Sequence, residues 1–321
     1  MNRRDTVFAL ASLAAAPRTT FAQARTVRFG ILVGRRNSSY LAPILKRLGE
    51  LGYAEGRNLV VEYRSADGAL ERFPPLAREL IEAKCDVIFA IGAEQAARAL
   101  VDAKSPIPVV IIASDYDPVK SGIVASLRRP GGNFTGVVVT QLELSAKRLE
   151  IMREILPAAT RYLVLGDATT KDQLDATRQA ARQLRVEIIA ETFGPLPYDF
   201  EAALARNRAA RIEALIVPSS AHLSDQRAKI SELAMKHRLP ASIANSWGDE
   251  GAFLLHYTAN LPKLGARAAE IAASILRGAK PAEIPVEQPT IYEMVINLKT
   301  ARALGIKMPQ SVLVRADRVV E

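Results

Sequence analysis

Short apolar runs alternate with longer helical stretches along most of the 321-residue chain, and this alternation limits the possible folds more than any other feature. The apolar runs are rich in β-branched residues and span 27–33, 59–63, 87–91, 109–112, 162–165, 186–190, 214–217 and 253–257. The helical stretches between them span 40–51, 69–83, 93–103, 142–156, 171–184, 199–208 and 225–237. Continuous apolar strands separated by helices predict parallel sheets covered on both faces, which is a doubly wound α/β architecture.

The α/β pattern occurs twice, which predicts two Rossmann-like lobes. A chain of this length allows two domains of about 100–200 residues each. Breaks in the pattern fall near 133–141, 248–251 and 285–289, so we expect the chain to cross between the lobes three times. One lobe is expected to contain residues 25–139 and 252–286, and the other residues 140–251 and 287–321.

The first 24 residues have the pattern of an export signal. Arg3 and Arg4 precede an apolar stretch at 6–16, and the small-x-small sequence Ala22-Gln23-Ala24 follows. A basic start, an apolar segment of about 7–15 residues and such a site are typical of a secretory signal peptide. The stretch is shorter than the roughly 20 residues of a membrane span. We expect cleavage after Ala24 and an exported protein; the alternative is a short amphipathic helix on a cytosolic protein.

The net charge of +9 does not by itself indicate a nucleic-acid partner. Such a partner requires basic residues clustered on a reading element, whereas here they are scattered over many helical stretches, for example Arg178 and Arg182. We therefore expect no nucleic-acid binding. Cys85 is the only cysteine, which excludes an intramolecular disulfide, and its position just before an apolar run indicates a half-buried, inert thiol.

The sequence lacks the motifs of the common nucleotide sites and hydrolases. Gly30 and Gly34 have the wrong spacing for a dinucleotide-binding turn, and no phosphate-binding loop motif is present, so we expect no cofactor. The histidines, His222, His237 and His256, lie at least about 15 residues apart, which does not favour a metal site. We expect His256 to lie in the core or at a cleft edge. These observations predict a protein that is not an enzyme.

Several segments, taken in order, carry a resemblance to a known family. They are 49–53 (GELGY), 55–58 (EGRN), 117–119 (DPV), 126–136 (SLRRPGGNFTG), 275–289 (ILRGAKPAEIPVEQP), 293–305 (EMVINLKTARALG) and 314–321 (VRADRVVE). Together they closely resemble a family of bacterial ABC-importer substrate-binding proteins that includes receptors for tryptophan and other aromatic amino acids. The resemblance implies a type I periplasmic binding protein fold, a small-molecule ligand between the lobes and a membrane permease as partner. We also expect a monomer.

The architecture predicts where a ligand would lie, because ligands of open α/β sheets bind beyond the carboxyl ends of the strands. Two facing lobes bring two such edges to one cleft. In the first lobe the expected contacts are Arg35, Ser38, Gly92, Ala93, Glu94, Ser114, Asp115, Tyr116 and Asp117. From the rest of the chain they are Thr140, Asp167, Thr169, Ser219, Ser220, Asn245, Trp247 and His256.

Some of these side chains have a second explanation. Serine and threonine at helix starts also serve as caps. Glu94 stands where relatives carry a small or hydroxylated residue; its carboxylate either complements the helix dipole or pairs with a ligand ammonium group. Trp247, the only tryptophan, forms either a wall of the ligand site or packing beneath a crossing.

These features predict a periplasmic receptor whose lobes close on a small polar ligand, either an amino acid, aromatic or not, or a related organic acid. One alternative is a transcriptional regulator built on the same fold. That class needs a DNA-binding helix-turn-helix ahead of Val27, where this chain has an export signal. The other alternative, an α/β enzyme acting in the cleft, is disfavoured by the missing motifs.

Overall fold

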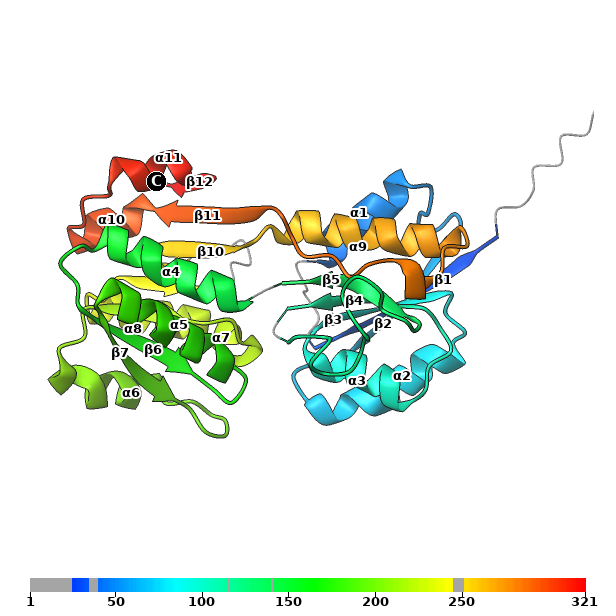
Figure 1. Cartoon of the computed structure of the whole chain (residues 1–321), viewed down its shortest axis with the longest axis horizontal. Coiled ribbons are helices and arrows are strands. Elements are labelled where there is room, and N and C mark those ends of the chain that lie inside the picture. Colours follow the sequence, from blue (N-terminus) through cyan, green and yellow to red (C-terminus); the bar gives the residue numbers. More distant parts are fainter. Residues whose placement is uncertain (1–24, 35–39, 115, 140, 245–250) are drawn as a thin grey trace, which may run out of the picture.

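The computed structural model describes residues 25–34, 40–114, 116–139, 141–244 and 251–321, which form two α/β lobes joined side by side (Figure 1). Their sheets have the strand orders β2-β1-β3-β4-β5 and β12-β11-β10-β9-β8-β6-β7. Every strand pairing is parallel in the described ranges apart from that of β10 with β11. The predicted two-lobed α/β class with parallel sheets is therefore confirmed, with one antiparallel pair added.

The first lobe has five parallel strands with helices on both faces. Its strands are β1 (Val27–Val33), β2 (Leu59–Ser65), β3 (Val87–Gly92), β4 (Val109–Ala113) and β5 (Phe134–Val138). Its helices are α1 (Leu41–Glu50), α2 (Phe73–Glu82), α3 (Glu94–Asp102) and α9 (Leu261–Leu276). Alternate residues of β1 supply two cores: Phe29 and Ile31 pack with α1 and α9, whereas Leu32 packs with α2 and α3. Strands β1, β3 and β4 are thus buried on both faces, which explains their continuous apolar runs, whereas the edge strand β2 is partly exposed.

The second lobe has seven strands and is built in the same way. Its strands are β6 (Arg161–Gly166), β7 (Glu187–Thr192), β8 (Ala214–Val217), β9 (Ala241–Ile243), β10 (Leu255–Ala259), β11 (Tyr292–Asn297) and β12 (Arg318–Val320). Its helices are α4 (Gln141–Ile155), α5 (Lys171–Leu184), α6 (Phe200–Arg206), α7 (Ala221–Asp225), α8 (Arg227–Lys236), α10 (Leu298–Leu304) and α11 (Gln310–Arg315). Helices α4, α5, α10 and α11 share one core, and α6, α7 and α8 share the other.

The second crossing lies further along the chain than the sequence indicated. Strand β10 pairs with β9 and β11, so residues 252–259 belong to the second lobe, and their assignment to the first lobe was wrong. The chain returns to the first lobe at α9, where Leu264 and Ala268 pack in the same core as Phe29 of β1. A short apolar strand fits either sheet, and the register of β10 against its neighbours decides which one it joins.

Two other segments carry the chain between the lobes. Between β5 and α4 the chain passes from the first sheet to the second lobe. After Val286, which packs in the first lobe, Glu287 bridges to Val137, and β11 then lies in the second sheet. Arg267 of α9 forms two hydrogen bonds of 2.7 Å with the Glu287 carboxylate. That pair holds the third crossing segment against α9.

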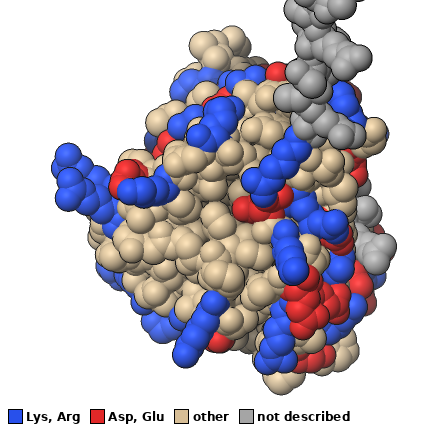
Figure 2. Space-filling model, turned by 90° about the vertical axis from the view of Figure 1, so that its right-hand side faces the viewer, with Lys and Arg blue, Asp and Glu red and all other residues tan. Residues whose placement is uncertain are grey.

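Charged side chains are spread over the surface with both signs close together. On the end face of the first lobe, lysine and arginine lie singly or beside acidic residues (Figure 2). Pairs in this lobe include Arg64 with Glu79 at 2.6 Å and Arg47 with Glu270 at 2.7 Å. The face shown carries no continuous basic patch of the kind that nucleic acid requires. Among the described helices, none is long and apolar enough to cross a membrane.

Candidate functional site

A cavity of about 400 Å³ lies between the two lobes, at the carboxyl ends of β4 and β6. The first lobe and the crossing segments contribute Tyr116, Asp117, Pro118, Lys120, Leu127, Val138, Val139 and Gln288. The second lobe contributes Gln141, Leu142, Ala168, Thr169, Lys171, Asp172 and Gln173. The volume of the cavity lies within the range of about 300–1,000 Å³ for small-molecule sites. The cavity therefore occupies the place that the fold reserves for a ligand.

The first-lobe wall of the cavity is largely apolar. Leu127, Val138 and Val139 line it next to the ring of Tyr116, which also packs against the core beneath α3. Burial raises the pKa of Tyr116, and the nearby carboxylate of Glu94 raises it further. The Tyr116 hydroxyl consequently stays protonated at neutral pH and is available as a hydrogen-bond donor.

Behind the second-lobe wall, the buried carboxylate of Asp167 organises the loop that follows β6. Its Oδ1 accepts hydrogen bonds from the Thr169 backbone N–H at 2.9 Å and the Thr169 hydroxyl at 2.6 Å. Its Oδ2 accepts from the Ser220 hydroxyl and, at 3.4 Å, from the Tyr198 hydroxyl. Burial and the Asp167 carboxylate raise the pKa of Tyr198 to about 12, so this hydroxyl remains a donor. The network fixes Thr169, which lines the cavity.

The loop after β8 is held to α5 by a paired side-chain contact. Gln173 Nε2 donates to the Ser219 carbonyl at 2.7 Å, and the Ser219 backbone N–H donates to Gln173 Oε1 at 2.9 Å. The next residue, Ser220, caps the short helix α7 by accepting from the Leu223 N–H. Ser219 and Ser220 are both buried, so in this structure they support the wall of the cavity.

The structure brings only part of the predicted contact set to the cavity. Tyr116, Asp117 and Thr169 line it, and Asp167, Ser219 and Ser220 lie directly behind its second-lobe wall. Six predicted residues lie outside the described ranges, so their predicted contacts stay predictions: Arg35, Ser38, Asp115, Thr140, Asn245 and Trp247.

The predicted residues after β3 and β4 lie at the expected sheet edge without lining the cavity. Gly92 ends β3 with a φ of +91°, Ala93 precedes α3 in extended backbone, and Ser114 contacts the Tyr40 hydroxyl at 3.1 Å. Glu94 begins α3 and pairs with Arg98 one turn later at 3.0 Å, with its side chain 36% exposed. This ion pair reduces the charge that Glu94 can offer to a ligand.

His256 lies inside the second sheet, where β10 pairs with β9 and β11. Its ring is buried and meets the ring of Phe253 edge to face, with 5.8 Å between the centroids. Of the two expected positions, the core and a cleft edge, His256 occupies the core, and although it was predicted as a ligand contact it does not line the cavity. Side chains outside the predicted contact set complete the cavity, among them Gln141 and Gln173, which lie in helices and belong to no recognisable motif.

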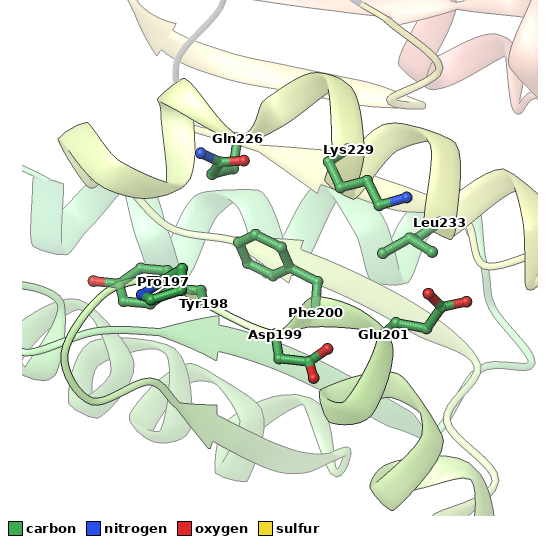
Figure 3. A pocket seen from close by; sticks show the side chains of 8 residues that line it. All are labelled: Pro197, Tyr198, Asp199, Phe200, Glu201, Gln226, Lys229 and Leu233. Carbon is green, nitrogen blue, oxygen red and sulfur yellow. The ribbon is translucent and has the colours of Figure 1, made fainter.

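A second hollow, of about 250 Å³, lies within the second lobe between the start of α6 and helix α8 (Figure 3). Its lining includes Tyr198 and Phe200 on one side and Gln226, Lys229 and Leu233 on the other. The ring of Phe200 points toward α8 and, being buried, belongs to the core of the lobe. No predicted contact lines this hollow, and the inter-lobe cavity remains the better ligand site.

Solved structures of other proteins have a similar two-lobed fold. The structure of a conserved domain protein from Vibrio cholerae O1 biovar El Tor matches with a TM-score of 0.82 and 23% identity, covering 92% of this chain and 100% of that one. An ABC domain in complex with L-Trp from Streptococcus pneumoniae matches with a TM-score of 0.81 and 22% identity, again over 92% and 100%. At these identities the likeness shows a shared fold.

Sequence comparison identifies the family. A tyrosine-binding protein of Clostridioides difficile (strain R20291) is 27% identical over 267 residues, which cover 82% of this chain and 75% of that protein. The family model described as ABC transporter substrate binding protein matches residues 38–320. The match takes in both lobes, all three crossings and the lining of the cavity. The chain therefore belongs to the family of ABC transporter substrate-binding proteins.

Proposed function

We propose that this substrate-binding protein captures an amino acid with an aromatic side chain in the inter-lobe cavity and delivers it to an ABC permease. The observation that carries the proposal is the composition of the cavity wall, in which an apolar surface from the first lobe faces charged side chains of both signs. Membership of a transport family favours this role over the regulator and enzyme alternatives.

The apolar wall suits an aromatic side chain. Tyr116, Leu127, Val138 and Val139 line one side of the cavity, and Leu142 at the start of α4 adds to them from the other lobe. Burying apolar ligand surface contributes roughly 25 cal/mol per Å². A ring placed here would gain most of its binding free energy from this surface, and the Tyr116 hydroxyl adds a donor.

The charged side chains suit a zwitterion. Asp117 and Asp172 line the cavity and provide acceptors for an ammonium group, whereas Lys120 and Lys171 provide positive charge. A ligand with one ammonium and one carboxylate group would leave this balance unchanged. Two relatives support the ligand class, since one carries the name tyrosine-binding protein and the other was solved with L-Trp.

The remaining parts of the proposal concern the setting in which the ligand is captured. We infer export directed by residues 1–24, a mature monomer without enzymatic activity, and closure of the lobes around the ligand by hinge motion at the three crossings. Contact with the permease would then involve both lobes, because closure is the signal that distinguishes the loaded receptor. Scattering measurements with and without ligand should show a smaller radius of gyration in the bound form.

A thermal-shift screen tests the ligand class directly. Tyrosine, tryptophan and phenylalanine should raise the unfolding temperature, because a ligand at 100 times its Kd stabilises the folded state by about 2.7 kcal/mol. Alanine and glutamate should give little or no shift. A stabilising effect of non-aromatic amino acids alone would contradict the proposal.

Two leucine substitutions separate the cavity from the rest of the surface. Leu142 lines the cavity and is 38% exposed, and Leu196 lies on a second-lobe loop and is 55% exposed. Leu142→Asp places a charge in the apolar part of the site and should weaken tyrosine or tryptophan binding by about tenfold or more. Leu196→Asp should leave the affinity unchanged. Equal affinities of the two variants, measured by calorimetry, would place the ligand elsewhere.

A further inference from the structure

We propose that Gln141 binds the carboxylate group of the ligand through its side-chain amide nitrogen, and that the buried Arg148 positions it for this role. The inference rests on the proposed function for the class of ligand. It goes further by assigning one end of the ligand to a specific donor, which neither a sequence motif nor the predicted contact set includes.

The position of Gln141 fits a ligand donor. It is the first residue of α4, it lines the cavity, and it is only 7% exposed. Its Oε1 accepts a hydrogen bond of 2.8 Å from Arg148. Within the described ranges, the side-chain nitrogen Nε2 has no hydrogen-bond partner. The donor belongs to a nearly buried residue that lines the cavity, and its hydrogens are unused, which suits a ligand acceptor.

Arg148 determines which end of the Gln141 amide faces the cavity. A guanidinium group only donates hydrogen bonds, so the amide must turn its oxygen toward Arg148 and its NH₂ group away. Arg148 itself is fully buried and held from two further directions, since it donates to the Tyr257 carbonyl at 3.0 Å and to the Ser145 hydroxyl at 3.3 Å. The orientation of the Gln141 amide, with its NH₂ group away from Arg148, is thus set before a ligand binds.

The surroundings favour a negatively charged partner for this donor. Helices α4 and α5 lie side by side, and both begin at the side of the second lobe that faces the first lobe (Figure 1). Their first residues, Gln141 and Lys171, line the cavity. The first turn of a helix has N–H groups without partners inside the helix and carries a partial positive charge. The guanidinium group of Arg148 adds a full positive charge behind Gln141.

The acidic residues at the cavity complete the orientation of the ligand. Asp117 belongs to the first lobe, and Asp172 lies one residue after Lys171 in α5. A zwitterion that placed its carboxylate against Gln141 would direct its ammonium group toward these carboxylates. The aromatic ring would then lie along the apolar wall of the first lobe.

Calorimetry with tyrosine and its decarboxylated analogue tyramine tests the assignment. Gln141→Glu keeps the length of the side chain and the contact with Arg148 but removes the donor, and Gln141→Leu removes both. Each should weaken tyrosine binding about tenfold to hundredfold and change tyramine binding by less than about threefold. Gln179→Glu, on an exposed face of α5, is the matched control and should leave both affinities unchanged.

The positioning role of Arg148 has its own test. Arg148→Lys keeps the positive charge and loses the planar group that fixes the amide. The ratio of tyrosine to tyramine affinity should fall, whereas damage to the fold alone would lower both affinities together. Variants of Gln141 that bind tyrosine as well as the natural protein, or that lose both ligands equally, would overturn the assignment.

A titration with acetate separates this inference from the proposed ligand class. The side-chain NH₂ signals of Gln141, assigned in the NMR spectrum by their loss in Gln141→Leu, should shift when millimolar acetate is added. A shift with acetate in a protein that binds no aromatic amino acid would support the carboxylate site and refute the proposed ligand. Signals that move with neither acetate nor tyrosine would refute the carboxylate site.

Discussion

Gly136 should be one of the least replaceable residues of the first lobe. It lies in β5 opposite Ile111 of β4 and has a φ of +143°, a conformation that is essentially restricted to glycine. A Cβ atom at this position would lie 2.1 Å from the Ile111 carbonyl oxygen and 2.6 Å from the Ile111 nitrogen. Both atoms belong to the backbone of a buried strand, so no side-chain rotation can relieve the overlap.

The expected cost of Gly136→Ala follows from these distances. The backbone conformation accounts for about 1–3 kcal/mol. Because β5 must move away from β4 by roughly 1 Å to reach an ordinary contact distance, one or more buried backbone groups lose their partners, at about 1–3 kcal/mol each. The free energy of unfolding should therefore fall by about 3–6 kcal/mol, which corresponds to a decrease in Tm of roughly 6–20 °C.

Urea and thermal unfolding followed by circular dichroism would measure this effect. Gly132→Ala is the matched control, because Gly132 precedes the same strand, has no positive φ, and has open space within 4 Å of where the alanine Cβ would lie. The control should change the free energy of unfolding by less than about 1 kcal/mol. If Gly136→Ala were as stable as Gly132→Ala, the close approach of β5 to β4 would be refuted.

Three further predictions concern single side chains. Burial, followed by the charge of Glu62, raises the pKa of Cys85 to about 11. The folded state should therefore lose stability as pH rises above the usual thiol pKa near 9. At pH 8 the native thiol should react with a disulfide reagent about a hundredfold more slowly than the thiol of the unfolded chain. Asn297 caps α10 by accepting from the Thr300 N–H at 2.9 Å, so Asn297→Ala should lower the free energy of unfolding by about 1–3 kcal/mol in urea titrations. Glu94→Gln should change tyrosine affinity by less than about threefold in calorimetry, because Arg98 already pairs with the carboxylate; a larger loss confined to ligands with an amine would restore its predicted role.

Strands buried on both faces were predictable because their sequence is apolar throughout. The run at 27–33 coincides with β1, and the run at 87–91 differs from β3 only at its last residue. Strand β2, an edge strand that is partly exposed and contains Glu62, extends two residues beyond its predicted run at 59–63. Strand β5 falls where the sequence indicated a crossing, since its short apolar run follows a Pro-Gly-Gly turn. Strands β9, β11 and β12 have three to six residues and depend on pairing with neighbours, which local sequence does not encode.

The candidate site was predictable only where it follows a strand. Tyr116, Asp117 and Thr169 were found because they lie in loops at the carboxyl ends of β4 and β6. Gln141 and Gln173 lie in helices, where a polar residue usually indicates a solvated face. Their contact with the cavity depends on how α4 packs beside α5, and a single sequence gives no direct signal of that packing.

The odd number of crossings has a consequence for the two ends of the chain. A chain that passes three times between two bodies must begin in one and finish in the other. Strand β1, the first described strand, accordingly lies in the first lobe, and Glu321 follows β12 in the second (Figure 1). Fluorophores attached at these ends would report the relative movement of the lobes through energy transfer, with no label inside the cavity. A covalent link between the same ends would add a fourth connection, remote from the other three, and would restrict the relative movement of the lobes.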